Sequence, residues 1–281
     1  MIPTRWIDLG RTDALTFHAT YAGLAAARQE DPLPAVVWGR VGAHVCLGQS
    51  QGMCELADAL DVPVVRRPLG GGTVWVDDMQ LSYALVAPLA SVPPRHADWY
   101  EWALGPAIAT YRDFGMAVER DAEDLWIAGR KIAGSGAATI GRSAVVASSF
   151  LLHFPRERFA CAIAAATEAF RTRLLEALAL AMTDWAAHGP VPDEATVRAR
   201  FQRALARELG WHAQAGAVDI AEAAEIESWR TELSEPIDAG TRRVPGGIKL
   251  NAALALATVN GAPVLVRRER AADLKGRHRV A

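Results

Sequence analysis

Five short apolar runs rich in β-forming residues follow one another in the first third of the chain, with glycine and proline between them. They span residues 35–38, 44–47, 62–66, 72–76 and 81–87. Runs of this length with such punctuation are typical of the strands of a sheet. The sequence therefore predicts a sheet built largely from this part of the chain.

Helical patterns lie on both sides of these runs. We expect helices over residues 13–29, 98–114, 155–185, 193–209 and 219–232. Further strands are expected at 6–9, 124–127, 131–133 and 144–154. Because strands and helices mix without strict β-α alternation, the pattern favours an α+β fold with a mixed sheet flanked by helices over a doubly wound parallel sheet.

The last fifty residues change character. Residues 246–250, 253–259 and 263–267 resemble strands, and Asn260-Gly261 between the last two is a strong hairpin signal. We expect a main domain over residues 1–235. Residues 236–281 form either a small accessory segment or extra strands of the main sheet.

Composition excludes several classes of function. The 281 residues carry a net charge of −2, which disfavours nucleic acid as a main ligand. Three cysteines without a CxxC pair predict neither a disulfide framework nor a structural zinc site, and they favour a reducing compartment. The N-terminus lacks a signal-peptide pattern and the apolar runs are too short to cross a bilayer, so we expect a cytoplasmic protein. We also expect a monomer.

The first segment that could take part in binding or catalysis is a triple-glycine turn. It reads Arg66-Arg67-Pro68-Leu69-Gly70-Gly71-Gly72-Thr73-Val74-Trp75-Val76-Asp77. Consecutive glycines allow positive φ angles and close backbone approach, and their N–H groups can bind carbonyl or phosphate oxygens. The spacing is neither that of a Walker A loop nor GxGxxG. Taken alone, such a turn is more often structural than an anion site.

The second segment is a turn that delivers Lys131 into a short strand, at Asp124-Leu125-Trp126-Ile127-Ala128-Gly129-Arg130-Lys131-Ile132-Ala133-Gly134-Ser135. A lysine inside an apolar β segment is costly to bury without a partner. Alone, it is equally consistent with an outward-facing lysine on an edge strand. Small residues follow at once, so another group can pack closely there.

Together, the two segments resemble the biotin/lipoate A/B protein ligase family, and most of all its lipoate–protein ligase A members. The segments at residues 38–51 and 168–184 are also similar to that family, so the resemblance covers about residues 5–185. It implies a catalytic domain over residues 1–235 with the fold shared by class II aminoacyl-tRNA synthetases and biotin synthetases. The resemblance also implies a reaction that joins lipoate to a lysine of a partner protein.

The resemblance implies a role for individual residues. Lys131 matches the lysine that binds the acyl carboxyl and the α-phosphate of the acyl-adenylate. Asp124 matches an acidic residue near the phosphates, where Mg²⁺ would be bound. The remaining matches are with substrate- or adenylate-binding positions, namely Arg67, Gly70, Gly71, Gly72, Val74, Trp75, Asp77, Gly134 and Ser135.

Three positions depart from the family pattern. Val76 stands where the family often has histidine, Glu123 where ligases often have asparagine, and Ala147-Ser148-Ser149 where many members have a histidine-containing segment. These departures concern nucleotide handling and substrate choice.

Three readings of the activity stay open. A ligase uses ATP and Mg²⁺ to convert lipoate to lipoyl-AMP and then acylates a lipoyl domain, a glycine-cleavage H protein or an H-protein-like carrier. A transferase takes octanoyl or lipoyl through a cysteine thioester, here at Cys161 or Cys54, whereas Cys46 lies in an apolar strand and reads as core. A non-catalytic relative binds without turnover. We favour the ligase, and we expect Arg267, Arg268 and Arg270 to meet an acidic acceptor.

Overall fold

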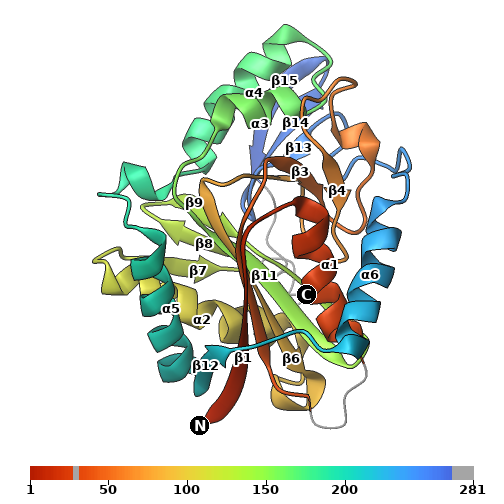
Figure 1. Ribbon diagram of the computed structural model, residues 1–281. Helices are drawn as coiled ribbons and strands as arrows, with labels where there is room; N and C mark the ends of the chain where they lie inside the picture. Colours follow the sequence, from red (N-terminus) through yellow and green to blue (C-terminus); the bar gives the residue numbers. More distant parts are fainter. Residues whose placement is uncertain (28–31, 268–281) are drawn as a thin grey trace, which may run out of the picture.

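A mixed six-stranded sheet forms the centre of the protein (Figure 1) in a computed structural model that describes residues 1–27 and 32–267. The strand order is β10-β11-β6-β2-β1-β12. Strand β1 runs parallel to β2 and β12, and the other neighbours are antiparallel. The strands are β1 (Ile2–Thr12), β2 (Ala35–Val41), β6 (Gln80–Pro88), β10 (Gly136–Ile140), β11 (Ser143–Leu151) and β12 (Trp211–Ala215).

Helices cover both faces of this sheet, which confirms the predicted α+β class (Figure 1). On one face lies α1 (Ala14–Ala26), with α6 (Ile220–Ser234) packed on it. The two helices approach so closely that a Cβ at Gly23 would lie 2.5 Å from the backbone nitrogen of Ile226. The other face carries α2 (Trp99–Asp113) and α5 (Glu194–Leu209) over an aromatic core of Trp38, Tyr83, Phe150 and Phe201.

Three small sheets lie beside the central one. The first has the order β4-β3-β5 and contains β3 (His44–Leu47), β4 (Val64–Arg66) and β5 (Val74–Val76). The second is the meander β7 (Glu119–Asp121), β8 (Asp124–Ile127) and β9 (Arg130–Gly134). The third is β13 (Ile248–Lys249), β14 (Leu254–Val259) and β15 (Ala262–Arg267). Helices α3 (Arg156–Ala162) and α4 (Glu168–Ala181) share a core with the first and third sheets.

The structure differs from the predicted elements at a few places. The helix expected over 155–185 is two helices, because Ile163 and Thr167 have extended backbone, Ile163 bridges to Leu56 and Thr167 caps a new helix. Strands β7, β10 and β12 were not predicted, since they consist mainly of small or polar residues. The expected helix at 13–29 ends at Ala26, and residues 28–29 lie outside the described part. Short 3₁₀ helices occur at Met53–Glu55, Leu89–Ser91, His96–Asp98 and Trp185–Ala187.

The C-terminal strands form a sheet of their own and do not extend the central one. Asn260 and Gly261 have φ angles of 50° and 80°, so the predicted hairpin turn between β14 and β15 is confirmed. The boundary at residue 235 stays a prediction. Within the described residues, no helix is both long and apolar enough for a membrane span.

Candidate active site

A cavity opens where α1, β11 and the three small sheets meet, and it encloses about 1130 Å³ including its open mouth. Its apolar wall comes from elements far apart in the sequence, and includes Phe17, Leu69, Val76, Leu151, Phe154 and Phe159. Most of the predicted site residues line the same space, namely Arg67, Gly71, Gly72, Val74, Trp75, Asp124, Lys131, Gly134 and Ser135. Gly70 and Asp77 lie outside the lining.

Arg67 holds the triple-glycine turn in shape. Its Nη2 donates to the carbonyl oxygens of Gly70 and Gly72, both at 2.9 Å, and its Nη1 lies 3.3 Å from the carbonyl oxygen of Cys46. The phosphate or carboxylate partner expected for this arginine stays a prediction, and its protein partners are backbone carbonyls. Gly71 has a φ of 112°, and a Cβ there would lie 2.5 Å from Arg67 Nη2. The glycines therefore allow the guanidinium to lie against the turn.

Lys131 is buried, and its ammonium faces the cavity. Its Nζ lies 2.8 Å from Oδ1 of Asp124, which gives the buried ammonium its counter-charge. A positive-φ turn at Ala128 and Gly129 joins β8 to β9. The pairing register of these two strands shifts between Leu125 and Trp126, and Trp126 is the residue that pairs with Lys131. Such bulges re-aim side chains. The backbone of Lys131 is further fixed by Thr183, whose N–H donates to the Lys131 carbonyl at 2.8 Å.

The small residues after Lys131 make room for its ammonium. A Cβ at Gly134 would lie 2.6 Å from Lys131 Nζ, so a larger residue there would displace the ammonium. Ser135 lines the cavity, but its hydroxyl donates to the Glu123 carbonyl oxygen. Ser148, from the stretch that departs from the family pattern, donates to the Gly134 carbonyl oxygen at 2.9 Å.

A second ammonium reaches the cavity from the C-terminal sheet. Lys249 on β13 pairs with Glu123, beside the pair of Lys131 and Asp124. Burial works to raise the pKa of Glu123, but the hydrogen bond and charge of Lys249 outweigh it and hold that pKa below its ordinary value. Burial lowers the pKa of the Lys249 ammonium, and the pairing with Glu123 offsets this only in part. Sequence reasoning assigned Lys249 only to a strand and missed it.

Asp124 was expected to be a magnesium ligand. Its Oδ1 accepts from Lys131, and its Oδ2 accepts from the backbone N–H of Ala252 at 2.8 Å. The other carboxylate of the lining, Glu123, is held by Lys249. Both carboxylates thus already face positively charged or N–H donors. This arrangement does not fit a magnesium ion at Asp124.

Trp75 and Asp77 act as a unit next to the glycine turn. The indole N–H of Trp75 donates to Oδ2 of Asp77 at 2.8 Å, and the N–H of Met79 donates to Oδ1 at 3.0 Å. Arg158 covers the Trp75 ring with its guanidinium carbon 4.7 Å from the centroid. Asp77 therefore positions Trp75 from outside the cavity, and its expected contact with the adenylate has no counterpart in the lining.

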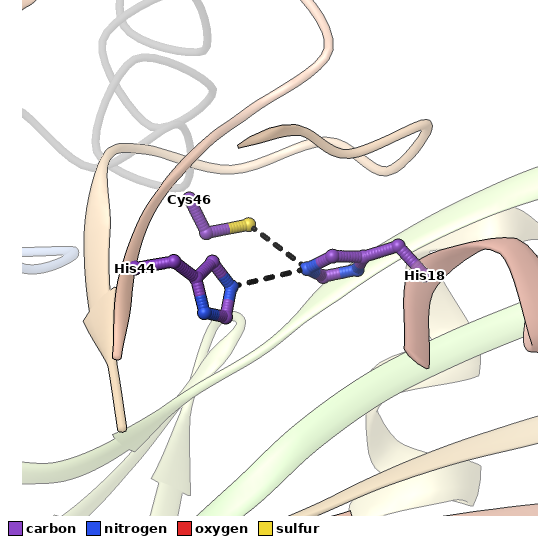
Figure 2. Close-up of side chains that lie close together, drawn as sticks. All are labelled: His18, His44 and Cys46. Atoms are coloured by element: carbon purple, nitrogen blue, oxygen red, sulfur yellow. Dashed lines mark hydrogen bonds between the residues drawn. The ribbon is translucent and has the colours of Figure 1, made fainter. Parts of the chain in front are cut away.

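Another polar cluster lines the cavity and consists of His18, His44 and Cys46 (Figure 2). The Cys46 Sγ lies 3.6 Å from Nε2 of His18 and 3.3 Å from Nη1 of Arg67. Burial and the charge of Arg67 lower the pKa of His18 to about 3, so its imidazole is neutral. For Cys46, burial works to raise the thiol pKa, but Arg67 and His44 outweigh it, and the pKa lies below its ordinary value.

Cys46 is the cysteine that faces the cavity, and sequence reasoning placed it in the core. It is buried as expected, but its position on β3 turns its thiol toward His18. Cys161 is exposed on α3, Cys54 is partly buried, and neither lines the cavity. The spacing His44-x-Cys46 on one strand was the sequence signal that could have placed both side chains on one face. Nothing in the sequence indicated that His18 would contact them.

Of the expected acceptor-binding arginines, Arg267 is exposed at the end of β15, and Arg268 and Arg270 lie outside the described residues.

Comparison with known proteins identifies the family and the fold of this chain. A family model described as the lipoyl protein ligase A/B catalytic domain matches residues 28–206. Among curated protein sequences, none matches this chain.

Solved structures with the same fold have little sequence in common with this chain. The bi-partite lipoate protein ligase from Thermoplasma acidophilum, described with its E2 lipoyl domain, is 17% identical with a TM-score of 0.74, over 83% of this chain and 93% of its own. A lipoate-protein ligase A bound with ATP is 16% identical with a TM-score of 0.68, over 82% and 95%. P. falciparum LipL1 in complex with lipoate is 11% identical with a TM-score of 0.61, over 92% and 84%. At these identities the similarity is evidence for the fold.

Proposed function

This chain belongs to the lipoyl protein ligase A/B catalytic domain family, and from that premise we propose that it is a lipoate–protein ligase. It converts lipoate and ATP to lipoyl-AMP, and then transfers the lipoyl group to a lysine of an acceptor. The observation that carries this proposal is the buried Lys131 ammonium, which faces a cavity that is also lined by the triple-glycine turn. The solved relatives described with ATP, with lipoate and with an E2 lipoyl domain support the choice of substrates.

Two steps make up the proposed reaction. In the first, a lipoate carboxylate oxygen bonds to the α-phosphorus of ATP while the bond from that phosphorus to the bridging oxygen breaks, and pyrophosphate leaves. In the second, the acceptor lysine nitrogen bonds to the acyl carbon, AMP leaves with the electrons of the broken C–O bond, and the amine loses its proton. Both steps build negative charge on oxygen atoms, which a buried ammonium stabilises.

The chain's own residues would divide this work. The Lys131 ammonium, exchanging part of its contact with Asp124, binds the carboxyl and the α-phosphate oxygens. The apolar wall of Phe17, Leu69, Leu151 and their neighbours surrounds the acyl chain and excludes water. Gly71 and Gly72 of the glycine turn line the cavity, and their N–H groups would face the acyl carbonyl and the nucleotide. No step is assigned to a magnesium ion at Asp124, because that carboxylate is already bound on both oxygens.

The test is an acylation assay with the full chain, free lipoate, ATP and an isolated E2 lipoyl domain or glycine-cleavage H protein. We expect the acceptor to gain one lipoyl mass only when ATP is present, and lipoyl-AMP to accumulate when the acceptor is left out. Both products are read by mass spectrometry. If neither product forms, the ligase proposal is wrong, and a transferase or a non-catalytic relative remains.

A transferase is the second candidate, and Cys46 is the observation that favours it. Its thiol lies in the cavity beside Arg67 and His18, which is where an activated nucleophile would be needed. In this reaction the Cys46 sulfur bonds to the acyl carbon of a carrier thioester, the carrier thiol leaves, and the acceptor lysine then displaces Cys46. This candidate predicts transfer from an octanoyl carrier protein without ATP, and an acyl adduct on Cys46.

A further inference from the structure

Two histidines and a cysteine from different elements point at one another inside the cavity. Figure 2 shows the three side chains converging, with His18 on α1 and both His44 and Cys46 on β3. The Nε2 atoms of His18 and His44 are 3.4 Å apart, and the Cys46 Sγ is 3.6 Å from His18 Nε2. All three side chains are buried, and the three facing atoms lie within 4.8 Å of one another. The ligase reaction proposed above uses neither histidine.

Local structure fixes the two β3 residues. Successive side chains of a strand point to opposite faces, so His44 and Cys46 share a face. Strand β3 is paired on both edges, with β4 and with β5, which leaves its backbone little freedom. The cluster is therefore held in place by the sheet, with only α1 contributing from outside it.

Outer hydrogen bonds orient both imidazoles. Nδ1 of His44 lies 2.8 Å from the carbonyl oxygen of Gly42, which can only accept, so the proton is on Nδ1 and the lone pair of Nε2 faces the cluster. Nδ1 of His18 lies 2.9 Å from the hydroxyl of the buried Tyr21. Metal-binding histidines in proteins are oriented in the same way by a carbonyl or another group on the far nitrogen.

Two of the three separations, His18 to His44 and His18 to Cys46, are those of ligands around a tetrahedral ion. With metal–nitrogen bonds of about 2.0–2.1 Å and a metal–sulfur bond of about 2.3 Å, tetrahedral angles put two nitrogens about 3.3–3.4 Å apart and nitrogen and sulfur about 3.6 Å apart. The observed distances are 3.4 Å and 3.6 Å. We propose that His18, His44 and Cys46 form a three-ligand zinc site whose fourth position opens into the cavity.

The chemistry of the donors selects the ion and its fourth ligand. Imidazole and thiolate suit zinc, whereas magnesium and calcium prefer oxygen. On binding, the Cys46 thiol releases its proton to solvent and forms the sulfur–zinc bond. The guanidinium of Arg67, 3.3 Å from the sulfur, adds positive charge beside the ion. The site therefore favours an anionic fourth ligand, which is hydroxide or the thiolate or carboxylate of a bound molecule.

This site differs from the structural zinc centre that the cysteine pattern excludes. Closed structural sites use four protein ligands and often CxxC pairs, whereas sites with three protein ligands keep a position for water or substrate. The competing explanation is a hydrogen-bond chain in which the Tyr21 hydroxyl donates to His18 and His18 Nε2–H donates to His44. That chain needs no ion and predicts no zinc binding.

The test is zinc binding by the full chain after treatment with a chelator, measured by elemental analysis and by competition with a zinc indicator. We expect one zinc per chain, at least tenfold weaker affinity in Cys46→Ser and in His44→Gln, and about tenfold weaker affinity in Tyr21→Phe. The matched control is the double variant Cys54→Ser/Cys161→Ser, which should bind as the natural chain does. Circular dichroism shows whether each variant is folded.

Cobalt binding tests the same site without substituting any of the three proposed ligands. In Cys54→Ser/Cys161→Ser, Cys46 is the sole cysteine left of the three. A thiolate-to-cobalt charge-transfer band with a tetrahedral visible spectrum in this variant therefore identifies Cys46 as a ligand. The proposal is overturned if that band is absent, or if the natural chain binds zinc no more tightly than Cys46→Ser. Neither readout uses acyl transfer, so this proposal and the ligase proposal fail separately.

Discussion

The cavity holds two polar clusters that balance charge in opposite ways. In the lysine cluster, each ammonium faces a carboxylate, Lys131 with Asp124 and Lys249 with Glu123. In the histidine cluster, Arg67, Cys46 and two imidazoles meet, and the acidic side chains of the described cavity lining both belong to the lysine cluster. Buried charge is costly unless it is paired. The lysine cluster is thus complete in itself, whereas the histidine cluster can take an ion and its anionic ligand.

The largest expected effect is loss of the Lys131 ammonium. Lys131→Met should lower the rate of ATP-dependent acyl transfer about 100-fold or more, because removing one preorganised donor to a developing charge has effects of this size. Transfer rates and melting temperatures are measured together, since the variant leaves Asp124 with only the Ala252 N–H. The matched control is Arg130→Ala on the same strand, outside the cavity lining, which should transfer normally. Equal transfer rates in both variants would show that the lysine cluster does not contribute to catalysis.

A change at Gly71 probes the histidine cluster through Arg67. Gly71→Ala places a Cβ 2.5 Å from Arg67 Nη2 at a φ of 112°, so the guanidinium must leave the turn. We expect about a tenfold loss in transfer rate, since displaced binding groups have effects of this order or larger. Gly105→Ala is the control, because its Cβ meets Glu208 at an ordinary 3.9 Å. A normal rate in Gly71→Ala would mean that the turn does not depend on its arginine.

The pair of Glu123 and Lys249 should contribute to stability in a pH-dependent way. Because the folded-state pKa of Glu123 lies below its ordinary value of 4.5, the contribution is present above that pH and is lost as the pH falls through the lowered pKa. Glu123→Gln should reduce the free energy of unfolding at neutral pH by about 1–3 kcal/mol. Urea unfolding at several pH values measures this. The difference between the variant and the natural chain should shrink in acid, and a constant difference would contradict the pairing.

The smallest effect is expected for the two thiols that lie outside both clusters. Cys54→Ser/Cys161→Ser should change ATP-dependent transfer by less than about twofold, because substitutions away from special features are nearly neutral. Neither side chain lines the cavity. A large loss of transfer in this double variant would instead show that Cys161 or Cys54 contributes to the ATP-dependent reaction.

The two clusters also differ in how far sequence could predict them. Lys131 and the glycine turn were found because each lies in a continuous motif, and the structure places Lys131, Gly71 and Gly72 around one cavity. The α+β class and most elements followed from periodicity and from turn residues such as Asn260-Gly261. Local patterns of this kind are determined by neighbours in the chain, so one sequence is sufficient to find them.

The remaining features depend on contacts between distant segments. His18 lies in an apolar helical run, and only the packing of α1 beside β3 brings it to Cys46. Lys249 was assigned to a strand, and its role appears only because the C-terminal sheet lies over β8. The hydrogen bonds of Asp77 to Trp75 and of Arg67 to the glycine turn were not predicted either. The pattern of side chains along the sequence does not determine which hydrogen-bond partner a polar group will have in the folded protein.

The late position of Lys249 and Ala252 bears on the order of events during synthesis. A growing chain that ends before residue 248 already contains Lys131 and the whole glycine turn, but Glu123 has no ammonium and Asp124 no Ala252 amide. Two neighbouring carboxylates would then share a single lysine. The finished cavity therefore arises only after the last strands have left the ribosome, because Lys249 and Ala252 complete the pairing of the two carboxylates.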